Sequence, residues 1–339
     1  MTELFLSIGT ATYNRAHDLS KVFACLCSQT LKNFEWVIVD DGSTDNTEEV
    51  VASFQKEDAG FDIRYYKIDH GGKHFAYNRI LDEIKGDWFT CVDSDDSLYD
   101  ENSVKSIYES WQSLTNEAKY NQIWGCMVNQ FGKVTPALDN DVLDITPEEY
   151  MNIFVRDSGR KNILNAVRVL RSSFAKKFKF PEVRDNLSFF PENIIGVRHA
   201  VEGGGNIRFF KKNWYSYTAS NPDSVCINAH QNDVMWYQHL YLINDFARYG
   251  ISEKYKKYVF KRLRWLARTI NKRKTFIHTL CSLDRKQDKM IFPIAWMMGL
   301  PRYIFDVRNK GYYKDITILG FHFLFKRKNK AQKNLLNKI

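Results

Sequence analysis

The first hundred residues alternate between short apolar stretches and segments in which apolar residues recur at helical spacing. Apolar side chains three or four positions apart, such as Leu19, Val22, Phe23 and Leu26, lie on one face of a helix. The expected strands cover residues 4–12, 34–39, 63–68 and 88–92, and the expected helices cover 19–26, 44–54 and 74–84. This order predicts an α/β fold with a mostly parallel central sheet and helices on both of its faces.

Two of the expected strands end in carboxylates. Asp40 and Asp41 follow the second strand, and Asp93, Asp95 and Asp96 follow the fourth. Like charges this close repel each other, which indicates that a cation neutralises them. Mg²⁺ and Mn²⁺ prefer carboxylate oxygens and are often held by one or two protein carboxylates together with substrate phosphates. Because ligands bind outside the carboxyl ends of parallel strands, we expect a metal-assisted site there. A solvated Asp/Ser turn is the alternative for the second cluster taken alone.

Five short motifs occur in order along this part of the chain. They are Ala11–Arg15, Ser28–Thr30, Val39–Asp45, His70–His74 with Asn78, and Val92–Asp96. Together they resemble the signature of glycosyltransferase family 2, over about residues 4–220 with falling strength, whereas residues after about 250 resemble no known family. The resemblance implies the Rossmann-like GT-A fold and the transfer of a sugar, with inversion, from a nucleotide-sugar donor.

The resemblance also assigns donor-binding residues. They are Ala11, Tyr13, Arg15, Asp41, Lys73, Asp93 and Ser94. It implies that the Asp41 carboxylate accepts a hydrogen bond from the imide N3–H of uracil or thymine, and that Tyr13 lies against the base with Arg15 near the base or the diphosphate. Lys73 is expected at the diphosphate, because the glycines before it let the backbone approach closely. Core packing for Tyr13 and a solvated lysine in an ordinary hairpin for Lys73 are the alternatives.

A divalent cofactor, Mn²⁺ or Mg²⁺, follows from the same resemblance. Asp95 is expected to bind it directly, and Asp93 to contact the ribose or a metal-bound water. Asp96 is left out of this set because its side chain can instead cap the segment that follows. His230 is a candidate third ligand, since imidazole suits Mn²⁺, although a histidine in a polar segment is commonly solvated.

Inverting transfer needs a general base to accept the proton of the acceptor hydroxyl. In the family, this base is an Asp or Glu roughly a hundred positions after the metal motif. Glu192, which follows an aromatic and proline run 97 positions after Asp95, is the expected base. Asp185 and Glu182 lie in the same segment and are competing candidates.

The length of the chain limits the number of domains, and the cysteines indicate the cellular compartment. A chain of 339 residues can form an α/β core and a second module. We expect a GT-A domain over 1–250, with a nucleotide-binding half at about 1–100 and an acceptor half at about 101–250, and a basic, mainly helical region over 251–339. The six cysteines form no Cys-x-x-Cys pair, and no apolar stretch typical of a signal peptide follows the N-terminus. Both observations favour reduced thiols and a cytoplasmic location.

The charge is divided sharply along the chain. Residues 253–339 hold 23 Lys/Arg and 5 Asp/Glu, a net charge of +18, whereas the residues before them hold 26 and 35, a net charge of −9. Basic and apolar residues interleave in Tyr255–Lys274, as in amphipathic helices that lie on anionic membranes. The apolar stretch 291–300 is too short to span a bilayer. We therefore expect peripheral attachment to the inner face of the cell membrane. A packed helical appendage is an alternative, and nucleic-acid binding is disfavoured because no nucleic-acid motif occurs.

These features together predict a metal-dependent inverting glycosyltransferase. The donor is expected to be a UDP-sugar and the acceptor a hydroxyl of a glycan or lipid-linked saccharide in cell-surface polysaccharide synthesis. A membrane-associated scaffold with a degenerate transferase domain is the alternative. A nucleotidyltransferase is disfavoured because the Gly-rich N-terminal loop usual in that class is absent.

Overall fold

A computed structural model describes most of the N-terminal two thirds of the chain and three strands near its C-terminus. The described ranges are 4–156, 165–180, 195–196, 198–199, 203–218, 305–310, 313–318 and 321–326. The chain divides into two compact units, residues 1–238 and 239–339, which are considered separately.

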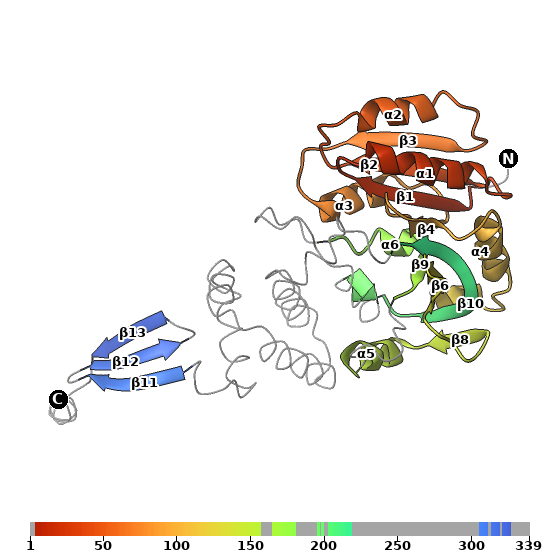
Figure 1. The fold of residues 1–339 in the computed structure, drawn as a ribbon. Coiled ribbons are helices and arrows are strands. Elements are labelled where there is room, and N and C mark those ends of the chain that lie inside the picture. Colours follow the sequence, from red (N-terminus) through yellow and green to blue (C-terminus); the bar gives the residue numbers. More distant parts are fainter. Residues whose placement is uncertain are drawn as a thin grey trace. The chain divides into compact units, whose positions relative to one another are not determined.

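A ten-stranded mixed sheet forms the centre of the first unit (Figure 1). Its main strand order is β3-β2-β1-β4-β9-β6-β10-β5, with β7 beside β6 and β8 beside β10. The strands are β1 (Leu6–Thr12), β2 (Phe34–Asp40), β3 (Asp62–Lys67), β4 (Trp88–Cys91), β5 (Ser97–Leu98), β6 (Tyr120–Asn129), β7 (Val134–Thr135), β8 (Val142–Ile145), β9 (Val167–Arg171) and β10 (Asn206–Tyr217). The first four are mutually parallel, and β9 runs against both β4 and β6. Because β10 is parallel to β6, both strands have the direction of β4 and end at the same edge of the sheet.

Helices cover both faces of the sheet. They are α1 (Ala16–Cys27), α2 (Thr47–Phe54), α3 (Lys73–Glu83), α4 (Ser103–Gln112), α5 (Pro147–Arg156) and α6 (Ser172–Ala175), with a 3-10 turn at Glu117–Lys119. The apolar faces of α1, α2 and α4 join one core cluster, and that of α3 joins another on the opposite face. The predicted α/β order is thus confirmed for the first hundred residues, with boundaries within a few positions.

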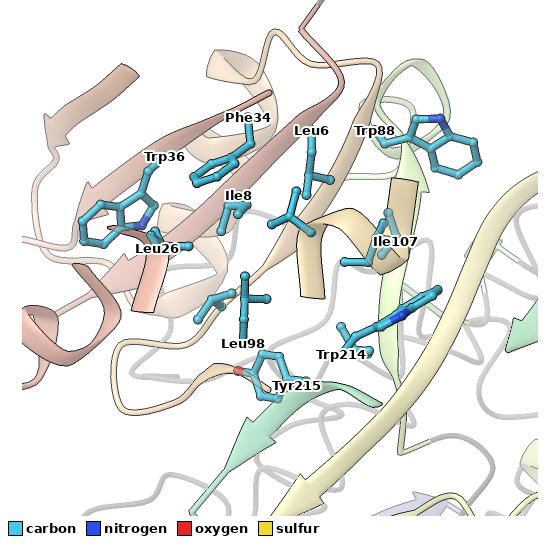
Figure 2. Close-up of a cluster of buried hydrophobic side chains, with 14 of the residues drawn as sticks. Leu6, Ile8, Leu26, Phe34, Trp36, Trp88, Leu98, Ile107, Trp214 and Tyr215 are labelled. Atoms are coloured by element: carbon cyan, nitrogen blue, oxygen red, sulfur yellow. The ribbon is translucent and has the colours of Figure 1, made fainter. Parts of the chain in front are cut away.

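The buried core is divided into two clusters, one on each face of the sheet, because successive side chains of a strand point to opposite faces. Trp36 and Ile38 of β2 point to the α1 side, whereas Val37 and Val39 point to the α3 side. Both faces of β2 are completely buried, as is typical of a strand inside a parallel sheet. Figure 2 shows the first of these clusters, in which β10 residue Trp214 lies in the same core as residues of β1 and β2. This first cluster therefore contains residues from both halves of the first unit.

The described part of the second unit is an antiparallel sheet. Its strands are β11 (Phe305–Lys310), β12 (Tyr313–Ile318) and β13 (Phe321–Lys326), with β12 between the other two. The sequence predicts a mainly helical region over 251–339, and these three strands were not expected. The expected amphipathic helix at Tyr255–Lys274 and the apolar stretch 291–300 lie outside the described residues. Within the described parts of the chain, no helix is long and apolar enough to cross a bilayer.

Candidate functional site

The loops that follow β1, β2 and β4 lie side by side at the carboxyl edge of the sheet. The strand register places Thr12 opposite Asp40, and Gly9 opposite Cys91, which precedes the acidic loop. Backbone hydrogen bonds continue the pairing past the strand ends, because Asp41 N–H donates to Thr12 O at 2.9 Å and Val92 N–H donates to Gly9 O at 2.9 Å. The topology therefore brings the three predicted motifs together.

Asp40 fixes the turn after β2 from within the protein. Its buried carboxylate accepts hydrogen bonds from the Ser43 amide at 2.7 Å and from the Tyr65 hydroxyl at 2.6 Å. Burial and the hydrogen bond to Asp40 raise the pKa of Tyr65 well above its usual range, so the hydroxyl keeps its proton and remains a donor. Gly42 in this turn has φ 79° and a Cβ there would lie 2.9 Å from His70 N, so only glycine fits.

Asn14 ties the loop after β1 to the same turn. Its backbone amide donates to Ser43 Oγ at 2.8 Å, and its side-chain oxygen accepts a hydrogen bond from the Thr44 amide at 2.8 Å. The residue has φ 52°, a conformation that asparagine tolerates better than most side chains. Asn14 thereby fixes the backbone between Tyr13 and Arg15, its two neighbours in the sequence.

Asp41 organises the loop that leads into α3. Its two carboxylate oxygens accept hydrogen bonds from the Gly71 amide at 2.9 Å and the Gly72 amide at 2.8 Å. The His70 ring lies 2.9 Å from one of these oxygens and stacks on Tyr13, with ring centroids 4.2 Å apart. Tyr13 is 43% exposed, so the core-packing alternative for this residue is wrong. His70 was not predicted as a site residue, although it is the first residue of the fourth motif, His70–His74.

Two ion pairs neutralise the acidic loop after β4. Lys73 Nζ lies 2.8 Å from Asp93 Oδ1, and Arg15 lies 3.1 Å from Asp95 Oδ2. Both carboxylates are partly exposed, at 38% and 24%. Lys73 is the first residue of α3, so the hairpin alternative for the glycine-rich loop is also wrong. The predicted cations and carboxylates thus meet at one place, from motifs far apart in the sequence.

Asp96 is held by β10. Its carboxylate accepts a hydrogen bond from the Tyr215 hydroxyl at 2.9 Å and one from the Thr218 amide at 3.2 Å. Burial and the nearby charge of Asp93 raise the pKa of Asp96 to about 7, although the hydrogen bond from Tyr215 acts in the opposite direction. The sequence offers no signal for Tyr215, which lies 119 positions from Asp96.

The remaining predicted site residues have different locations. Ala11 lies near the end of β1, opposite Val39, and Ser94 is buried in the acidic loop. Glu192 and His230 lie outside the described residues, as do the competing bases Asp185 and Glu182.

The acidic loop fits a divalent cation held by few protein ligands. Asp93 and Asp95 supply partly exposed carboxylate oxygens, which suit Mg²⁺ or Mn²⁺. Among the residues that the structure describes, no group of three or more His, Cys, Asp or Glu side chains is placed to hold a metal. Mg²⁺ is commonly bound by one or two protein carboxylates together with water and substrate phosphates, which Asp93 and Asp95 suit.

In open α/β sheets, ligands bind outside the carboxyl ends of the parallel strands, and the paired acidic and basic side chains lie there beside Tyr13. Residues 7–118 match the model of "Glycosyl transferase family 2", and this part of the chain is a domain of that family. The family that the sequence motifs predict is thus confirmed for this segment.

Two relatives illustrate the match. Glycosyltransferase GlyG of Streptococcus pneumoniae is 34% identical over 112 residues, which make up 33% of this chain and 36% of that protein. The GalNAc(5)-diNAcBac-PP-undecaprenol beta-1,3-glucosyltransferase of Campylobacter jejuni is 27% identical over 132 residues, or 38% and 40% of the two chains. The matched segment thus spans less than half the length of each relative.

Solved structures share the fold over a longer span. The crystal structure of S. aureus TarS 1–349 has a TM-score of 0.58 at 16% identity and covers 95% of this chain and 99% of its own. It has also been solved in complex with UDP-GlcNAc. Mannosyltransferase PcManGT from Pyrobaculum calidifontis, in complex with GDP-Man and Mn²⁺, has a TM-score of 0.52 at 12% identity, covering 89% and 82%. These similarities confirm the predicted GT-A fold class.

Proposed function

We propose that this protein is a metal-dependent inverting glycosyltransferase that takes its sugar from a UDP-sugar. The observation that carries the proposal is the pairing of Lys73 with Asp93 and of Arg15 with Asp95 beside Tyr13. A nucleoside diphosphate brings negative charge that can take over both cations. Its arrival would leave the two carboxylates for a divalent ion, so the local charge stays balanced in both states.

The donor residues divide between the base and the diphosphate. Tyr13 lies against the uracil ring and Asp41 accepts its N3–H, while Ala11 and Ser94 line the site. Arg15 and Lys73 bind the diphosphate, and Asp93 contacts the ribose or a metal-bound water. Asp41 already accepts hydrogen bonds from the Gly71 and Gly72 amides and lies against His70, and an ionised carboxylate accepts about four hydrogen bonds, so it has the capacity for one more from the base.

The metal and the base complete the proposed reaction. Asp95, with His230, would hold Mn²⁺ or Mg²⁺, and the bound cation would supply positive charge next to the leaving diphosphate. Glu192 takes the proton from the acceptor hydroxyl as its oxygen attacks C1 of the sugar, with Asp185 and Glu182 as alternatives.

The acceptor is a glycan or a lipid-linked saccharide. Support comes from the Campylobacter relative, whose name describes an undecaprenol-linked substrate. The basic segment after residue 253 provides attachment to an anionic membrane surface, with the enzyme on the cytoplasmic face. The transferase domain extends to about residue 250 and the basic region follows it.

The test is a calorimetric titration of UDP into the full chain with Mn²⁺ and again with EDTA. We expect Asp95→Asn to weaken UDP binding about tenfold or more in Mn²⁺ and not to weaken it in EDTA, because the carboxylate acts on the donor through the metal, while its other partner, Arg15, stays available for the diphosphate. The matched control is Asp62→Asn, an exposed acid at the start of β3, on the opposite edge of the sheet.

Three outcomes are informative. Metal-dependent UDP binding that is lost in Asp95→Asn alone supports the proposal, and transfer or hydrolysis of a UDP-sugar extends it to catalysis. Full metal dependence in Asp95→Asn contradicts the role of this residue. A complete lack of nucleotide binding by the wild type contradicts the enzymatic proposal and favours a scaffold.

A further inference from the structure

Tyr215 joins the two ends of the acidic loop to the strand β10. Its hydroxyl oxygen accepts a hydrogen bond from the Asp93 amide at 3.0 Å, and its proton is donated to Asp96 Oδ2 at 2.9 Å. A further hydrogen bond, from Asp96 N–H to Asp93 O at 3.1 Å, closes the loop itself. One phenol thus bridges the first and the last acidic residue of the loop.

The tyrosine is a rigid support for these contacts. Tyr215 is 5% exposed, pairs with Leu98 of β5 in the strand register and shares the core cluster with Trp214 (Figure 2). Thr218, three residues after Tyr215, donates a hydrogen bond from its backbone amide to Asp96 Oδ1 at 3.2 Å. Tyr215 and Thr218, at the end of β10 and just after it, therefore hold Asp96, while the Asp93 and Asp95 side chains contact their cationic partners.

We propose that Tyr215 and Asp96 are a positioning pair that sets the geometry of the acidic loop for metal-dependent donor binding. This inference rests on the proposed function, because it concerns the same site. Neither side chain is assigned to the donor or to the metal. Their effect is on the backbone between them, which carries Asp93 and Asp95.

The physical reason lies in the polar groups that the phenol satisfies. Without its hydroxyl, the Asp93 amide loses its acceptor and Asp96 loses one of its two donors. Partly buried polar groups that lose their partners are costly, so the loop relaxes toward water. Supporting hydrogen bonds of this kind typically change metal affinity by 10-fold to 100-fold when they are removed.

The test compares Tyr215→Phe with the wild type in the full chain, with UDP and Mn²⁺ as probes. We expect the dissociation constant of UDP in Mn²⁺ to rise by about 10-fold to 100-fold and the constant in EDTA to stay unchanged. The matched control is Tyr120→Phe, which removes a hydrogen bond to Asp144 at 2.9 Å in another part of the same sheet. It should lower the melting temperature slightly without changing the ratio of the two constants.

A double-mutant cycle with Asp96→Ala separates a pair from two independent effects. If the residues act together, the double variant binds UDP in Mn²⁺ no more weakly than the worse single variant. Full additivity would overturn the pairing. The positioning role would be overturned if the folded Tyr215→Phe variant kept the wild-type ratio between the dissociation constants of UDP in EDTA and in Mn²⁺. An equal loss of UDP affinity under both conditions leaves this ratio unchanged and would have the same meaning. If the wild type itself shows no metal-dependent UDP binding, the proposed function fails first.

Discussion

Asp40 and Asp41 are neighbours in the sequence, yet their carboxylates have different partners. Asp40 is held inside the protein by Ser43 and Tyr65, which makes it part of the scaffold. Asp41 holds the Gly71 and Gly72 amides on the other side of the strand end. Asp40 is the last residue of β2, whereas Asp41 is the first residue of the loop that follows, so the two carboxylates point to different partners. Of this pair of buried acids, Asp40 is structural, and Asp41 is the one that we propose as a donor-binding residue.

His199 gives a prediction at the scale of a single residue. The ring is buried against Phe174 and Phe178, and neither ring nitrogen has a hydrogen-bond partner among the described residues. Burial, with the positive charges of Arg168 and Arg198, lowers the pKa of His199 to about 3. Between this value and the ordinary pKa of about 6.5, the unfolded chain binds a proton that the native protein does not. The free energy of unfolding therefore falls as the pH is lowered through this window, by up to about 1.4 kcal/mol per pH unit from this group.

Urea denaturation of the wild type and of His199→Leu between pH 7 and pH 4 measures this contribution. We expect the variant to lose less stability than the wild type as the pH falls, because leucine takes up no proton. Carboxylates contribute equally to both proteins and cancel in the difference. Parallel stability curves over this range would show that His199 is not buried in its neutral form.

At the scale of elements, β10 links the two halves of the first unit. It pairs with β6, β8 and β5, supplies Trp214 to the core and ends at the acidic loop. Close contact between β10 and β6 depends on Gly125, where an added Cβ would overlap the Trp214 ring. The indole is further fixed by its hydrogen bond to Ser106 Oγ of α4 at 3.0 Å, so it has little freedom to move aside.

Gly125→Ala should therefore destabilise the protein by about 1–3 kcal/mol, the usual cost of an extra methyl group in a packed core. The measurement is the free energy of unfolding from urea titration. Trp214→Leu in the same chain makes room for the methyl group, so the two substitutions together should cost less than the sum of their separate effects. Strict additivity would mean that the contact between Gly125 and Trp214 does not limit the packing of β6 on β10.

At the scale of the whole molecule, the uneven distribution of charge along the chain predicts binding to an anionic membrane surface. The net charge of +18 after residue 252 is opposite in sign to the −9 before it. Basic residues near an anionic bilayer each contribute roughly 1 kcal/mol to binding. The attraction extends over about one Debye length, which becomes shorter as the salt concentration rises. The full chain is therefore expected to bind vesicles through its basic region.

Co-sedimentation with phosphatidylglycerol-containing vesicles tests this expectation. Binding should be strong at low salt, decline as salt is raised, and be weak on neutral phosphatidylcholine vesicles. Replacing Lys256, Lys257 and Lys261 with Gln should weaken binding about 100-fold, which corresponds to roughly 3 kcal/mol. Equal binding to neutral vesicles, or no effect of this triple variant, would contradict electrostatic attachment through Tyr255–Lys274.

The sequence by itself determined the order of strands and helices in the first hundred residues, the family of this domain and the acidic and basic residues of its loops. These features are local, because side-chain periodicity and turn composition depend on residues a few positions apart. It did not indicate the strands of residues 305–326, nor β9 running against its neighbours, since pairing partners are chosen by burial across the whole sheet.

Only the tertiary structure decided which side chains meet. Lys73 with Asp93, Arg15 with Asp95, and Tyr215 with Asp96 are separated by 20, 80 and 119 positions, and no local pattern connects them. They meet because parallel strands bring their carboxyl ends to one edge of the sheet and because β10 ends beside the acidic loop. The types of residue at the site were thus set by the sequence, whereas their partners were set by the topology of the sheet.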